Sequence, residues 1–73
     1  RLERAELLNH LTEAMQQLDQ RRLQILVLYY HQQLTMKQIA NVLDITESRV
    51  SQLHASALFS LSLKLEQWKD GGF

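Results

Sequence analysis

The stretch TMKQIANVLDITESRVSQL, residues 35–53, carries two signals for the start of a helix. Thr35 precedes an amphipathic pattern, and Gln38 follows it at the spacing of a capping box, in which each side chain bonds the other residue's backbone N–H. Thr46 repeats the start signal ahead of Glu47, whose negative charge suits the positive end of a helix dipole. The stretch therefore predicts two consecutive helices joined by a short turn.

The composition of this turn fits a helix-turn-helix. The small side chain of Ala40 allows the two helices to approach closely. Asp44 stands where such turns commonly hold glycine, and aspartate can adopt the left-handed backbone conformation. Apolar residues of both helices and of the turn are expected to form a shared core: Ile39, Leu43, Ile45, Val50 and Leu53. We therefore predict a helix-turn-helix made of helices 36–43 and 47–68.

The segment before the helix-turn-helix is also expected to be helical. Apolar residues at i, i+3 and i+4 spacing predict a first helix over residues 3–18. Asp19 can cap a second helix, over residues 20–31. This second segment contains the apolar run LQILVLYY, residues 23–30, whose length fits a strand as well as a helix. Its helical neighbours and the lack of Gly and Pro favour a buried helix.

Length and composition indicate one small all-α domain of four helices, residues 1–73. Such a chain supports a single apolar core and leaves little room for a substrate cavity, so we expect no small-molecule substrate. There is no cysteine for a disulfide or a thiolate metal site. The chain starts at Arg1 and not at methionine, so we expect it to come from the C-terminus of a longer protein.

The residues suited to chemistry do not form the patterns that catalysis or metal binding needs. His10, His31 and His54 lie on different predicted helices and show no metal-ligand spacing. Ser51 lies one helical turn from His54, but no carboxylate is placed to orient the imidazole. No apolar run is long enough to cross a membrane. We expect no enzyme activity, no metal or other cofactor, and no membrane partner.

The exposed face of the last helix carries polar side chains that can read DNA. In a helix-turn-helix the first turns of the second helix meet base edges in the major groove. Gln52 can pair with adenine, Arg49 with guanine or a phosphate, and Glu47 with a cytosine amino group. A solvated polar face is the alternative, because nearly every amphipathic helix has one. The predicted DNA-binding set is Thr35, Lys37, Thr46, Glu47, Ser48, Arg49, Ser51 and Gln52.

Phe59 and Leu63 lie outside the apolar stripe of the last helix, four residues apart. The C-terminal half of the helix could pack against the first helix on a shifted face, which would place both residues in the core. They could instead form a contact surface for a protein partner, or be a stray exposed pair. The second of these interpretations makes them candidate partner-contact residues.

The segment LYYHQQLTMKQIANVLDITESRVSQLHASAL, residues 28–58, resembles the C-terminal domain, domain 4, of bacterial sigma factors. The match is nearest to the flagellar or motility class, and ESRVSQLH, residues 47–54, is its most specific part. The resemblance implies a four-helix domain whose helix-turn-helix binds the promoter element about 35 base pairs upstream of the transcription start. It further implies that Glu47, Ser48 and Gln52 face bases. It places Thr46, Arg49 and Ser51 near the DNA backbone or neighbouring bases.

The same resemblance implies protein partners. Domain 4 of this family receives a flap of the RNA polymerase beta subunit in an apolar groove formed by its earlier helices, and anti-sigma factors commonly compete for these surfaces. A transcription initiation factor of this kind would work in the bacterial cytoplasm, at the nucleoid.

The chain departs from the family after Ala57, where the family is rich in Lys and Arg and this chain reads LFSLS, residues 58–62. The charges of the whole chain also cancel, with eight basic and eight acidic residues. We therefore expect weak DNA binding by the isolated domain. Two other readings stay open: the output domain of a transcriptional activator, and a helix-turn-helix converted to a protein-interaction module. The activator class usually has several basic residues in the reading helix, which here has only Arg49.

Overall fold

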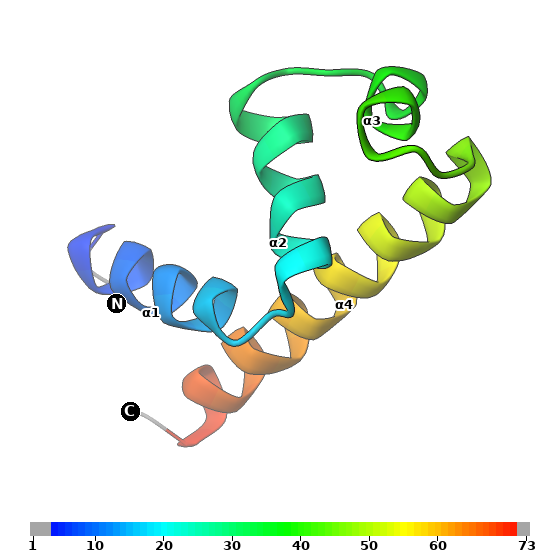
Figure 1. Ribbon diagram of the computed structural model, residues 1–73. Helices are drawn as coiled ribbons and strands as arrows, with labels where there is room; N and C mark the ends of the chain where they lie inside the picture. The colour runs from blue at the N-terminus through cyan, green and yellow to red at the C-terminus, as the bar shows by residue number, and fades with distance from the viewer. Residues whose placement is uncertain (1–3, 72–73) are drawn as a thin grey trace.

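The computed structural model describes residues 4–71, the last four of them by their backbone alone. Residues 4–71 are helical apart from short connections and contain no strand, so the predicted all-α class is confirmed (Figure 1). The elements are α1 (Arg4–Gln16), α2 (Gln20–Leu26), η1 (Val27–His31), α3 (Met36–Leu43) and α4 (Glu47–Gly71).

The predicted helix boundaries agree closely with the observed ones. The helix 36–43 is confirmed as α3, and α4 begins at Glu47 as expected but continues to Gly71, past the predicted end at residue 68. The first helix ends at Gln16, two residues before its predicted end. Its predicted start at residue 3 lies outside the described residues.

The second predicted helix, residues 20–31, is two kinds of helix in succession. An α-helix ends at Leu26, and η1 continues as a π-helix in which the Gln32 N–H bonds the Val27 carbonyl oxygen at 3.0 Å. The strand alternative for this segment is therefore wrong. The expected buried helix is confirmed as a helix but is buried only in part: Ile25 and Leu26 are buried, whereas Val27 is 39% and Tyr30 55% exposed.

Helices α3 and α4 begin at the residues predicted from the sequence, and each is capped by a threonine side chain. The Thr35 hydroxyl oxygen accepts from the Gln38 N–H at 3.1 Å, and the Gln38 side-chain oxygen accepts from the Thr35 N–H at 2.9 Å. Thr46 accepts from the N–H of Arg49 at 3.0 Å. These bonds satisfy N–H groups that a helix start otherwise leaves unpaired, so α3 and α4 begin at defined residues.

The turn between α3 and α4 has the expected left-handed residue. Asp44 adopts φ 57° and ψ 46°, and its N–H bonds the Ala40 carbonyl oxygen. Ala40 is buried, as expected of a small residue that lets two helices approach closely. A second left-handed residue, Gln33 at φ 59°, lies in the connection between η1 and α3.

Two apolar clusters hold the helices together. Ile25 and Leu26 are neighbours on α2, yet each belongs to a different cluster. The helix-turn-helix cluster buries Ile25, Ile39, Ala40, Val50 and Leu53. The second cluster, between α1, α2 and the middle of α4, buries Ala14, Leu26, Ala57 and Leu61.

The long helix α4 is the axis of the domain. It contacts α1, α2 and α3 along its length, while α2 stands between the other two (Figure 1). At about 1.5 Å per residue its 25 residues span roughly 37 Å, close to the 42 Å long dimension of the domain. The fold thus presents the first turns of α4 beside α3, at the end of the molecule away from α1.

Candidate nucleic-acid interface

The helix-turn-helix brings the predicted DNA-binding residues to one end of the domain. Thr35 and Lys37 come from the start of α3 and Thr46 from the turn before α4, and the other five come from the first two turns of α4. Side-chain exposure suits contact with a ligand, because every member of the set is exposed: Thr35, Lys37, Thr46, Glu47, Ser48, Arg49, Ser51 and Gln52.

The two threonines at the helix starts combine a structural and a binding capacity. Thr35 and Thr46 each use a lone pair of the hydroxyl oxygen to accept a backbone N–H. The hydroxyl hydrogen is still available as a donor. Each cap can therefore stabilise its helix and donate to a phosphate oxygen at the same time.

Arg49 and Gln52 contact each other on the exposed side of α4. A guanidinium nitrogen of Arg49 lies 3.5 Å from the Gln52 side-chain oxygen, at the long limit of a hydrogen bond. This contact occupies one guanidinium nitrogen and leaves further guanidinium donors of Arg49 available. The pair forms a donor-rich group one turn into the helix, suited to purine edges or to a phosphate.

Positive charge is scarce around these residues. Lys37 and Arg49 are the cations of the predicted set, and Glu47 carries a negative charge. Between Val50 and Leu63 the sequence of α4 has no Lys, Arg, Asp or Glu. The interface can make hydrogen bonds to DNA, but it offers only about two ionic contacts to phosphates.

Comparison with known proteins identifies the motif. The family model described as Sigma-70, region 4 matches residues 14–62, which include α2, η1, α3 and most of the side chains that α4 buries. The chain belongs to the sigma-70 region 4 family. The predicted likeness to domain 4 of sigma factors is thus confirmed, and with it the DNA-binding helix-turn-helix.

Individual relatives agree with this family. The chain is 41% identical over 59 residues to RNA polymerase sigma factor FliA of Pseudomonas aeruginosa, a match that covers 81% of the chain and 24% of that protein. It is 47% identical over 53 residues to FliA of Escherichia coli K12, covering 73% and 22%. Against RNA polymerase sigma-D factor of Bacillus subtilis it is 37% identical over 62 residues, covering 85% and 24%.

The chain spans about a quarter of the length of the curated relatives it matches. No solved structure matches it significantly.

The apolar pair of α4 lies on the surface of this region 4 domain. Phe59 is 65% and Leu63 43% exposed. The interpretation that both residues pack into the core against α1 is therefore wrong. Their role as a contact surface for a partner stays a prediction.

A contact between η1 and α4 was not expected from the sequence. The Tyr30 hydroxyl lies 2.9 Å from Nε2 of His54, and the two rings are stacked with centroids 5.6 Å apart. Tyr29 adds a tilted contact to the same imidazole at 4.9 Å. The three rings connect the π-helix to α4 at His54, two residues after Gln52, so η1 packs beside the predicted DNA-binding residues.

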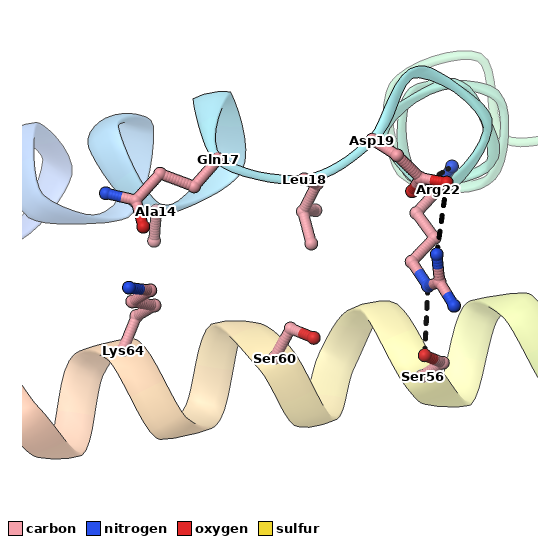
Figure 2. Close-up of a pocket in the computed structure, with 8 residues that line it drawn as sticks. All are labelled: Ala14, Gln17, Leu18, Asp19, Arg22, Ser56, Ser60 and Lys64. Carbon is pink, nitrogen blue, oxygen red and sulfur yellow. Dashed lines mark hydrogen bonds and ion pairs between the residues drawn. The ribbon is translucent and has the colours of Figure 1, made fainter.

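A polar cleft separates the end of α1 from α4. Figure 2 shows Arg22 pointing across it to α4, where its Nε donates to the Ser56 hydroxyl at 2.9 Å. The same guanidinium pairs with Asp19 at 3.0 Å. This hydrogen-bonded pairing lowers the pKa of the Asp19 carboxyl. The cleft, of about 380 Å³, is lined by Ala14, Gln17, Leu18, Asp19, Arg22, Ser56, Ser60 and Lys64.

An apolar groove lies between α1 and the C-terminal half of α4. It has a volume of about 440 Å³. The residues that line it are Leu11, Leu58, Leu61, Ser62, Leu65 and Glu66. The mostly leucine lining of this groove suits contact with an apolar surface of a protein more than contact with a nucleic acid.

Neither a metal-binding cluster nor a membrane span is found among the described residues. No three His, Asp or Glu side chains among residues 4–67 gather closely enough to hold a metal ion. Within residues 4–71 no helix has the length and hydropathy of a membrane span.

Proposed function

We propose that the chain is the promoter-recognition module of a flagellar-type sigma factor, which reads the −35 element in the DNA major groove through α4. The observation that carries the proposal is the exposed first turns of α4, held by the caps of a region 4 helix-turn-helix. Likeness to FliA proteins supports the flagellar class. Such a module acts in the bacterial cytoplasm, at the nucleoid.

In this proposal, exposed side chains of α4 contact the base edges in the DNA major groove. Gln52 pairs with adenine through its amide, Ser48 bonds an adjacent base edge, and Glu47 accepts from a cytosine amino group. Arg49 lies beside Gln52 and bonds a guanine or a phosphate. Each well-formed bidentate pair contributes about 1–3 kcal/mol of discrimination against a wrong base.

Phosphate contacts hold the domain in register. Thr35, Lys37, Thr46 and Ser51 supply hydroxyls and one ammonium group at the rim of the helix-turn-helix. With two cations in the set, the electrostatic contribution to binding is small. A domain tethered to polymerase acts at high effective concentration, so weak intrinsic affinity is sufficient.

The apolar groove between α1 and α4 is the proposed docking site for the flap of the RNA polymerase beta subunit. Leu11, Leu58 and Leu65 line it and can cover an apolar helix of the flap. The occupant is proposed from the resemblance to sigma factors, which implies an apolar groove formed by the earlier helices of domain 4; here Leu11 of α1 contributes to the groove and the other lining residues come from α4. Anti-sigma factors are expected to compete for the same surface.

One observation favours a second candidate, a helix-turn-helix that mainly binds protein. Phe59 is strongly exposed, and the chain has zero formal net charge. This candidate predicts capture of polymerase core together with equal binding to the promoter duplex and to the scrambled duplex. The activator reading has no such support, because the relatives are sigma factors.

A paired assay tests the proposal. Fluorescence anisotropy at low salt would compare a motility-type promoter duplex with a duplex scrambled at the −35 element. We expect specific binding weaker than micromolar, and loss of the preference in Gln52→Ala. Submicromolar affinity would overturn the weak-binding expectation, and equal binding to both duplexes would overturn base readout.

The docking step is tested separately. The beta-subunit flap, immobilised as an isolated segment, should retain the wild-type chain and lose Leu58→Glu, which places a charge in the groove. Gln52→Ala, which lies outside the groove, is the matched control and should be retained. Equal retention of all three chains would contradict docking in this groove.

A further inference from the structure

The base-reading face of α4 continues past Gln52 as an apolar ridge. Phe59 follows Gln52 by seven residues, which at about 100° per residue is within roughly 20° of two full turns. Ala55 lies between them on the same side, and Ala55 and Phe59 are both exposed. Phe59 is the most exposed of the large apolar side chains in residues 4–67, at 65%.

The chemistry of this ridge excludes an ionic contact. Sequence positions 50–63 of α4 hold no Lys, Arg, Asp or Glu, so this part of the helix has no Lys or Arg to form an ion pair with a phosphate. The C5-methyl group of thymine is the apolar group that a base pair presents in the major groove, and Ala and Phe side chains are suited to contact it. A side chain such as Phe59 gains from this contact because both partners leave water.

We propose that Ala55 and Phe59 are specificity-determining residues, which contact thymine methyl groups next to the base pairs read by Gln52. The inference rests on the proposed function, because it requires α4 to lie in the major groove. It adds to that function a preference for thymine. The preferred thymines lie at the end of the DNA site nearest to the C-terminal half of α4.

Distances along the helix are compatible with this contact. At about 1.5 Å per residue, Ala55 lies roughly 4.5 Å and Phe59 roughly 10 Å beyond Gln52 along the axis. Successive bases are about 3.4 Å apart along the duplex, so in an arrangement with α4 along the groove the two residues correspond to roughly one and three base pairs. Glu66 is exposed on the same side two turns beyond Phe59, and its charge repels phosphates. The DNA-contacting surface therefore ends near Phe59.

The shape of the ridge favours contact with the DNA major groove over contact with a protein surface. A stable protein interface buries about 800 Å² on each partner, whereas one phenylalanine supplies about 150–250 Å². On the exposed side around Phe59 lie the small residues Ala55 and Ser62 and, one turn further on, Leu63, which is 43% exposed; the exposed Leu58 faces the groove beside α1. A narrow line of side chains on a convex helix matches the major groove, which is about 12 Å wide.

Uracil substitution tests the proposal, because deoxyuridine pairs like thymidine but lacks the methyl group. Each thymine of a bound promoter duplex would be replaced in turn and the affinity measured by anisotropy. For the wild-type chain we expect about a fourfold loss at one or two positions, the value for one buried methyl. Phe59→Ala should bind the thymine duplex more weakly and lose this sensitivity at one position.

Leu63→Ala is the matched control. Leu63 lies one turn beyond Phe59 on nearly the same face and is also exposed, at 43%. This variant should keep the full pattern of uracil sensitivity. Because Phe59 and Leu63 are exposed, both variants are expected to keep the thermal midpoint of the wild type, which a melting curve checks.

The possible outcomes distinguish failure of the proposed function from failure of the thymine methyl contact. Failure of the wild-type chain to prefer a promoter duplex would overturn the proposed function itself. Specific binding with no uracil-sensitive position would overturn the methyl contact alone. A Phe59→Ala chain with unchanged DNA binding and reduced capture by the beta-subunit flap or an anti-sigma factor would also overturn it, in favour of a protein contact.

Discussion

Arg22 of α2 reaches across the polar cleft to Ser56 of α4, and its Nε donates a hydrogen bond of 2.9 Å to the serine hydroxyl (Figure 2). The same side chain bonds Asp19, the cap of α2, at 3.0 Å. One guanidinium thus joins the α1–α2 connection to the middle of the reading helix. This link fixes where α2 lies along α4, at a half-buried position where the bond is partly shielded from water.

Ser56→Ala should destabilise the domain by about 1 kcal/mol, because a half-buried charged donor loses its acceptor. Thermal unfolding followed by circular dichroism measures the change. Ser62→Ala, at an exposed serine of the same helix, is the control and should stay within about 0.5 kcal/mol of wild type. Equal stability of the two variants would show that the Arg22 bond contributes nothing net.

Thr46→Ala should cost about 1 kcal/mol of stability through loss of the cap of α4. Thr46→Asp keeps a capping oxygen, so it should fold as well as wild type while it weakens DNA binding by repelling a phosphate. Denaturant unfolding and anisotropy together separate the two effects. Unchanged DNA affinity in Thr46→Asp would remove Thr46 from the interface.

Gln33→Gly should stabilise the domain, because Gln33 has φ 59° and only glycine adopts this conformation without steric cost. Relief of about 1–2 kcal/mol exceeds the entropy that glycine adds to the unfolded chain, about 0.4–1 kcal/mol, so a net gain of about 0.5–1 kcal/mol is expected. Gln32→Gly is the control. Gln32 has φ −86°, so glycine there should give no gain. A lower melting temperature in Gln33→Gly would contradict the prediction.

The salt dependence of DNA binding should be shallow. With Lys37 and Arg49 as the phosphate-contacting cations, log K is expected to fall with log salt at a slope of about −2. Lys37→Gln should reduce this slope by about one at every sequence tested. Lys64→Gln removes a charge from the polar cleft, away from the reading face, and should leave the slope unchanged. A steep wild-type slope would mean that other cations contact the duplex.

Asp19 should make stability sensitive to acid. Its hydrogen bond from Arg22 lowers the pKa of the carboxyl below its ordinary value of 3.8. A lowered folded-state pKa means that the contribution is fully present above pH 3.8 and is lost as the pH falls through the lowered value. Asp19→Asn should therefore melt at a lower temperature than wild type at neutral pH, and the difference should shrink in strong acid. A constant difference across this range would assign the effect to capping and not to charge.

Much of the helix-turn-helix could be predicted because its determinants are local. The capping pair Thr35 and Gln38, the left-handed Asp44 and the cap Thr46 act on residues three or four positions away. The repeat of apolar residues at helical spacing identified Val50 and Leu53 as buried. The exposure of the predicted reading residues follows from the same repeat, since residues opposite a buried stripe must face water.

The contacts that could not be predicted join residues that are far apart in the sequence. Tyr30 meets His54 and Arg22 meets Ser56 only because α2 and η1 lie across α4. The change to a π-helix at Val27 was not predicted from the sequence.

The sequence by itself determined the helices, their starts, the helix-turn-helix and the family, because helical periodicity and capping are interactions within one or two turns. Only the tertiary structure decided that Phe59 faces solvent and that Ile25 and Leu26 belong to separate clusters. Which side of a helix is buried at each point depends on where its neighbours cross it. In this domain α1 crosses α4 near Ala57 and Leu61, which leaves Phe59 uncovered on the opposite side.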